Sequence, residues 1–114
     1  GSSAGTLTQG AQAVAIGAQA GATTQHNKAI AIGGQAGKTD QGTNSIAIGE
    51  NAGFASQSDN TIVLNATGGV LNTVGAAGDG LFIAPIQALP VAGAGGNGKN
   101  LWYNTSTKEI CYEP

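Results

Sequence analysis

The chain has 114 residues, only 9% of them charged, and a formal net charge of −2. Its basic residues are four lysines, so it lacks the basic patch on which nucleic-acid binding depends. The low charge also argues against disorder driven by charge repulsion, and the length is that of one domain with at most a small appendage. No apolar run approaches the roughly 20 residues that cross a bilayer, so we expect no membrane insertion.

The chain begins with small residues. Gly1 and Ser2 are typical of an expression tag, and we expect residues 1–8 to be a lead-in outside the fold. The single cysteine, Cys111, excludes a disulfide within one chain. Because it lies in an alternating segment, we expect Cys111 to be buried rather than reactive.

A short phrase then returns at a constant 16-residue step, at 13–17, 29–33 and 45–49, and in weakened form at 61–65. A glutamine keeps the same step at positions 9, 25, 41 and 57. A strict short period is typical of one structural unit stacked on copies of itself. We therefore expect an all-β solenoid of four 16-residue coils over residues 9–72.

Within each phrase, large β-branched residues alternate with small ones, which predicts a strand with period two. The second half of each coil is expected to hold a turn, a short second strand and another turn. We expect the large side chains to fill the inside of the solenoid and the alanines and serine to form a smooth opposite face. The predicted core is Val14, Ile16, Ile30, Ile32, Ile46, Ile48, Ile62 and Leu64.

A glycine ends three of these phrases, at Gly17, Gly33 and Gly49. Glycine at a repeating position indicates a tight turn or a close approach of two backbones, so these three are the predicted turn glycines.

The remaining residues, 73–114, are expected to form a second region. Residues 73–98 are irregular and glycine-rich, with one apolar stretch at 81–86. Residues 99–114 alternate on both sides of the polar loop Thr105–Lys108, which predicts a β-hairpin. Three of the five aromatic residues lie there, so we expect the hairpin to cap one end of the rod.

No catalytic constellation is visible, and we expect no cofactor and no metal site. Residues 33–39 approach the phosphate-loop pattern but are one residue short of it, and the 16-residue repeat accounts for their glycines. His26 is the only histidine, so a site made of several histidines cannot form within one chain.

The phrase Asn44-Ser45-Ile46-Ala47-Ile48-Gly49, repeated in register over residues 9–65, resembles the head repeats of YadA-like trimeric autotransporter adhesins. Those heads are left-handed parallel β-rolls in which three chains pack side by side. Many bacterial heads have a shorter repeat, whereas the 16-residue step of this chain looks more like the form in fibre proteins of phages and large DNA viruses. The segments 62–68, 82–86 and 101–110 resemble the roll closure, neck and hairpin of such fibres.

The resemblance implies a homotrimeric structural and adhesive module of a surface fibre, located extracellularly on a virion, with a host receptor such as a glycan as its partner. Two alternatives stay open: the head of a bacterial trimeric adhesin on the outer cell surface, and a parallel β-helix enzyme acting on glycans or acyl groups. The candidate receptor-facing loop residues, chosen for expected exposure, are Gln25, His26, Asn27, Lys28, Lys38, Asp40, Gln57 and Asp59.

Overall fold

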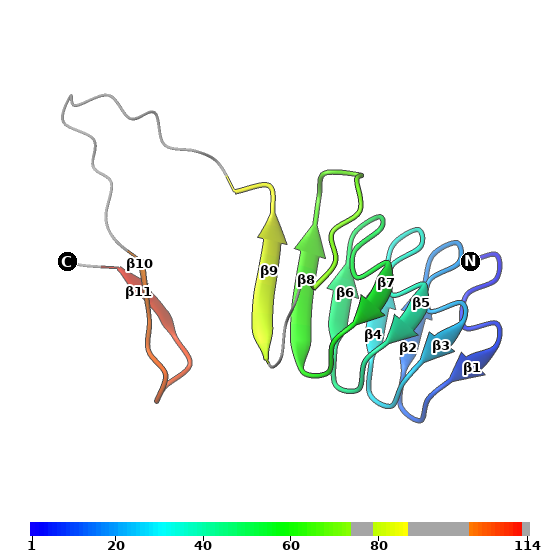
Figure 1. Cartoon of the computed structure of the whole chain (residues 1–114), viewed down its shortest axis with the longest axis horizontal. Coiled ribbons are helices and arrows are strands. Elements are labelled where there is room, and N and C mark those ends of the chain that lie inside the picture. Colours follow the sequence, from blue (N-terminus) through cyan, green and yellow to red (C-terminus); the bar gives the residue numbers. More distant parts are fainter. Residues whose placement is uncertain (74–78, 87–100, 113–114) are drawn as a thin grey trace.

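The computed structural model describes residues 1–73, 79–86 and 101–112. These form an all-β chain whose main body is a parallel β-solenoid of about four turns (Figure 1). One sheet has the order β1-β3-β5-β7 and the other β2-β4-β6-β8-β9. The first sheet holds β1 (Thr8–Gln9), β3 (Thr24–Gln25), β5 (Thr39–Gln41) and β7 (Ala55–Gln57). The second holds β2 (Val14–Ile16), β4 (Ile30–Ile32), β6 (Ile46–Ile48), β8 (Thr61–Asn65) and β9 (Gly80–Ala84).

The register of the second sheet follows the sequence period. Val14 pairs with Ile30, Ile30 with Ile46, and Ile46 with Ile62, all in parallel. The partners in each pair are one full period of the sequence apart, so the repeat length equals one coil. The second strand expected in each coil is present as β1, β3, β5 and β7.

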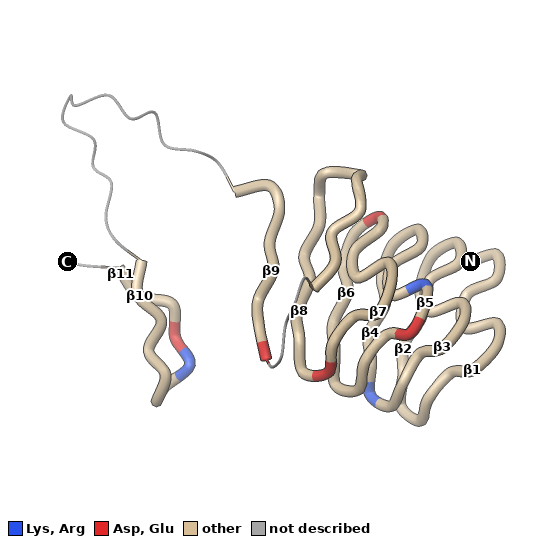
Figure 2. Tube along the Cα trace, in the orientation of Figure 1, with Lys and Arg blue, Asp and Glu red and all other residues tan. Residues whose placement is uncertain are grey.

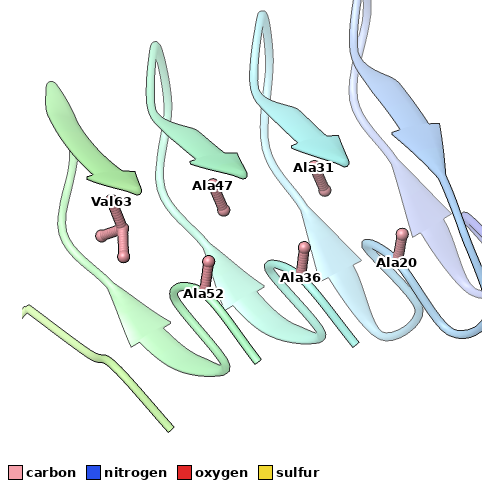
Figure 3. Close-up of a cluster of buried hydrophobic side chains, with 6 residues drawn as sticks. All are labelled: Ala20, Ala31, Ala36, Ala47, Ala52 and Val63. Carbon is pink, nitrogen blue, oxygen red and sulfur yellow. The ribbon is translucent and has the colours of Figure 1, made fainter. Parts of the chain in front are cut away.

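The interior of the roll is built from small side chains, which corrects the predicted core. Figure 3 shows alanines from the turns facing the central residues of the strands across the roll. The buried cluster is Ala20, Ala31, Ala36, Ala47, Ala52 and Val63, each with no exposed surface. The predicted core residues Val14, Ile16, Ile30, Ile32, Ile46, Ile48, Ile62 and Leu64 instead lie on the outer face of the second sheet, where each is half-buried or exposed.

The reason for this inversion is the narrow space between the two sheets. In the first three coils neither of the two strands is longer than three residues, and the turn between them already places an alanine such as Ala36 against the centre of a strand such as β4. Gln25, Gln41 and Gln57 are buried as well. Two further isoleucines per coil would overfill the space between the sheets. The strands predicted from the alternation are therefore correct, but the prediction of which face points inward is wrong.

The three repeated glycines lie where adjacent coils touch. Gly17, Gly33 and Gly49 have φ angles of 123°, 125° and 109°, which side chains rarely tolerate. A Cβ on Gly33 would lie 2.7 Å from the carbonyl carbon of Gly49 in the next coil. The positive φ and the close stacking both require glycine.

Residues 1–8 are part of the roll rather than a lead-in. The amide of Gly5 donates to the carbonyl of Ala20 at 2.9 Å, and Thr8 pairs with Thr24 in parallel. Each of these pairs is close to one period apart. The roll therefore includes residues 1–8, and the boundary expected at residue 9 is wrong.

The other end of the roll is covered by β9, which pairs in parallel along the whole length of β8. Phe82 stands opposite Val63 and packs, with Leu71, against the buried cluster. The boundary expected at residue 72 is thus wrong as well, since residues 80–84 complete the second sheet. Of the irregular segment 73–98, positions 74–78 and 87–98 lie outside the described residues.

The predicted hairpin is present as β10 (Leu101–Tyr103) and β11 (Ile110–Tyr112), paired antiparallel. Every described residue of the hairpin is exposed. Cys111 is exposed too, contrary to the expectation that it is buried.

Candidate self-association face

The most distinctive surface of the chain is a continuous apolar ladder on the outer face of the second sheet. It consists of two parallel rows, because residues on either side of the buried central position of each strand point outward. One row is Val14, Ile30, Ile46, Ile62 and Leu81, and the other is Ile16, Ile32, Ile48, Leu64 and Ile83. We call these ten residues the outer ladder.

The outer ladder remains accessible to solvent in the single chain. Ile16 is 56% exposed, Leu81 48% and Ile62 38%. Soluble monomers rarely expose contiguous apolar patches of more than a few hundred Å², and larger ones mark interaction sites. The ladder is therefore the strongest candidate for a functional surface on this chain.

No charged residue interrupts this surface. Figure 2 shows the charged positions of the roll outside the five strands of the second sheet, and none of those strands contains Lys, Arg, Asp or Glu. An uncharged sheet face can pack against another apolar surface without burying an unpaired charge.

Sequence reasoning missed two members of the ladder, Leu81 and Ile83. They alternate around Phe82 just as Ile46 and Ile48 alternate around Ala47. This alternation was the available signal, but the longer offset between Ile62 and Leu81 breaks the 16-residue period.

An apolar pocket lies at the end of the ladder, with a volume of about 340 Å³. Its lining residues are Ile48, Gly49, Leu64, Asn65, Ala66, Ile83, Ala84 and Pro85. None of them is ionisable, so the pocket offers space to an apolar group but no acid, base or nucleophile for catalysis.

The candidate loop residues divide into exposed and buried sets. His26, Asn27, Lys28, Asp40 and Asp59 are exposed, and Lys38 is half-buried. Gln25 and Gln57 are buried, at 0% and 3% exposure, so assigning them to a receptor-facing surface was wrong. Their side-chain amides donate to the carbonyls of Val14 at 2.7 Å and Ile46 at 3.0 Å, which ties the two sheets together.

The exposed loop residues make mainly local contacts. His26 Nε2 lies 3.0 Å from Asp40 Oδ1, and both side chains are about half exposed, so solvent weakens this pair. Asp59 accepts a hydrogen bond from the amide of Thr43 at 2.7 Å. Lys38 Nζ lies 5.1 Å from the centre of the Phe54 ring, in range for a cation–π contact.

Among the described residues, no three acidic, histidine or cysteine side chains gather where they could hold a metal ion. The same residues include no helix with the length and hydropathy of a membrane span. Comparisons of the chain with protein-family models, with curated proteins and with solved structures give no match.

Proposed function

We propose that this chain is a structural and adhesive module of a trimeric surface fibre of viral or phage type. In this proposal three copies pack through their outer ladders and present their coil loops to a host receptor. The proposal is supported above all by one observation, the uncharged apolar ladder that runs over all five strands of the second sheet.

The physical argument starts from the thin interior of the roll. A core made mainly of alanine buries little apolar area, while the larger isoleucines lie outside it. Burying apolar area contributes about 25 cal/mol per Å², so packing the ladders of several copies together would add a second and larger core. Three copies around an axis would cover every ladder and leave the loops of the first sheet facing outward.

Binding of the assembled protein to a glycan array and to intact host cells tests the adhesive part. We expect binding by the assembly, and a loss of roughly 10²-fold or more in a variant whose ladder carries Ile62→Lys, because multivalency is lost with the assembly. The matched control Val70→Lys changes an exposed apolar residue outside the ladder and should bind normally. Conversion of glycans or acyl donors by the protein, or absence of binding to every array and cell surface tried, would contradict the proposal.

A further inference from the structure

The two ends of the roll differ in how their backbone is covered. At the C-terminal end, β9 pairs with β8 and so covers the second sheet. On the first sheet, the side chains of Asn72 and Thr73 accept hydrogen bonds from the amides of Ala55 and Ser58, both at 3.1 Å. The last coil of the roll therefore has partners on both sheets.

The N-terminal end of the roll is formed by β1 and β2, which are edge strands of their sheets (Figure 1). The inward-facing residues of this first coil are partly open. Ala15 is half-buried, whereas Ala31, one period later, has no exposed surface. Gln9 is exposed, whereas Gln25 is fully buried. In the part of the chain that the structure describes, no strand pairs with the outer side of β1 or β2.

The backbone of β2 shows where a partner strand would bind. Val14 donates to the carbonyl of Ala29 at 2.9 Å, and Ile16 accepts from the amide of Gly33 at 2.8 Å, so both residues bond toward β4. The residue between them, Ala15, directs its amide and carbonyl to the opposite side, toward the open edge. Such a row of backbone groups is a template for a further strand.

The first coil has the geometry of an internal coil rather than that of a cap. Ser3 has a φ angle of 58°, close to the 57° of Gln19 one period later. A Cβ on Gly1 would lie 2.4 Å from the carbonyl carbon of Gly17, much as one on Gly17 would lie 2.7 Å from that of Gly33. Solenoids end in atypical capping repeats. This coil instead keeps the features with which one coil stacks on another.

We propose that the N-terminal edge of the roll is a docking site for a further coil of the same 16-residue repeat, joined to the chain at Gly1. In each of the first three coils, the strand of the second sheet ends at an isoleucine and a glycine follows directly, as in Ile16-Gly17. Gly1 holds the position of that glycine, so a strand that enters at Gly1 would lie beside β2 in parallel register. This pairing occurs within one chain and does not depend on the trimer.

The edge fits such a coil better than it fits either end of a second copy. The C-terminal end of another roll presents β9, which extends the second sheet only, so among the described residues it offers β1 no partner strand. Two N-terminal edges that met about a two-fold axis would pair antiparallel. The glycines that stack in parallel register, such as Gly1 on Gly17, would then have no glycine opposite them.

Extension of the chain tests the proposal. A second copy of residues 17–32 is placed directly before Gly1, so that an isoleucine precedes Gly1 as Ile16 precedes Gly17. The matched control carries the same segment in reversed order, which keeps its length and composition but places its side chains out of register. Amide hydrogen exchange is measured at Ala15 in the unchanged chain and in both extended chains, with the paired residue Ala31 as the reference.

In the unchanged chain, we expect the Ala15 amide to exchange much faster than the Ala31 amide, because it faces the open edge. The added coil should slow exchange at Ala15 by at least about tenfold, since its amide then gains a partner, whereas the reversed segment should leave the rate unchanged.

Equal slowing by both extensions, no slowing by either, or an unchanged chain in which Ala15 is already as protected as Ala31 would each overturn the inference. Faster exchange at Ala31 in the chain with the added copy would overturn it as well, because the extra coil would then disrupt the roll. Light scattering on the same samples tests the trimer separately. A monomeric mass with Ala15 slowed overturns the proposed function and leaves the docking edge standing.

Discussion

At the scale of single residues, the buried glutamines connect the repeat to the stability of the roll. Gln41 has no exposed surface, donates to the carbonyl of Ile30 at 2.8 Å and accepts from Gln25 Nε2 at 3.1 Å. A buried polar group stabilises a fold only when it is hydrogen-bonded, and these bonds join one coil to the next. A glutamine recurs once per coil because each coil has an equivalent strand carbonyl, such as that of Ile30, that needs a hydrogen-bond donor.

We predict that Gln41→Ala lowers the free energy of unfolding by about 1–3 kcal/mol, since it leaves buried groups without partners. Gln35→Ala is the matched control, because Gln35 is only half-buried and its amide bonds to Gln19 rather than to a carbonyl between the sheets. Urea unfolding at one fixed protein concentration compares the two. Equal losses in both variants would show that the interior glutamines have no special role.

The turn glycines allow a second residue-scale prediction. Gly33→Ala should cost about 1–3 kcal/mol from the positive φ alone, and the clash with the backbone of Gly49 adds to this. At the adjacent Gly34, a new Cβ would meet only Glu50 Cγ, at 3.9 Å, so Gly34→Ala should change stability by less than about 1 kcal/mol. Thermal unfolding of both variants checks the difference, and a tolerated Gly33→Ala would contradict the stacking argument.

At the scale of elements, β9 determines how the roll ends. The central strand position changes from Ala31 and Ala47 to Val63 and then to Phe82 along the second sheet. The side chain thus becomes larger where the sheet reaches its last strand and more space must be filled. Phe82 therefore closes the interior that alanines fill elsewhere.

We predict that Phe82→Ala destabilises the end of the roll by about 2 kcal/mol, roughly half the cost for a fully buried phenylalanine. Amide hydrogen exchange should become faster in β8 and β9 but remain slow in β4 and β6. Ile86→Ala, at a residue that is 76% exposed just after β9, is the control and should leave exchange unchanged. Uniformly faster exchange over all coils would mean that the roll unfolds only as one unit.

The repeat predicted most of this element structure from sequence alone. Period and alternation identified the two strands of each 16-residue coil, the coil length and the hairpin, but not β9, which lies outside the repeat. They could not assign the two faces of β4 or β6, because alternation states that Ile46 and Ala47 point opposite ways without saying which way is inward. That depends on the distance between the sheets, which the turn residues Ala36 and Ala52 set.

The outer ladder was harder to predict from the sequence than the strands for the same reason. With the isoleucines assigned to the interior, the apolar outer face that they form could not be predicted. Gln25 and Gln57 were placed on loops, although each ends a strand and its side chain faces inward. A polar residue repeated as strictly as an apolar one was the signal that it has a fixed partner.

At the scale of the whole molecule, the roll has a small core inside and a larger apolar surface outside. In the proposed trimer, association adds to the stability of the chain, because packing the ladders together would bury isoleucines, whereas the interior of the single roll buries alanines. The strands of the second sheet carry no charged residue, whereas the charged positions of the roll lie on its turns and loops and, with Asp40, on β5 of the first sheet (Figure 2). In the proposed trimer the first of these surfaces serves self-contact and the second faces the receptor.

The mass in solution, measured by light scattering on a sizing column, tests the central claim most directly. We predict a mass near three times 11.0 kDa for the unchanged chain. Ile62→Lys should shift it toward a single chain, because a lysine would have to be buried unpaired between ladders, whereas Val70→Lys should not. A mass near 11.0 kDa for the unchanged chain at micromolar concentration would show that the outer ladder stays in water, and would contradict the account.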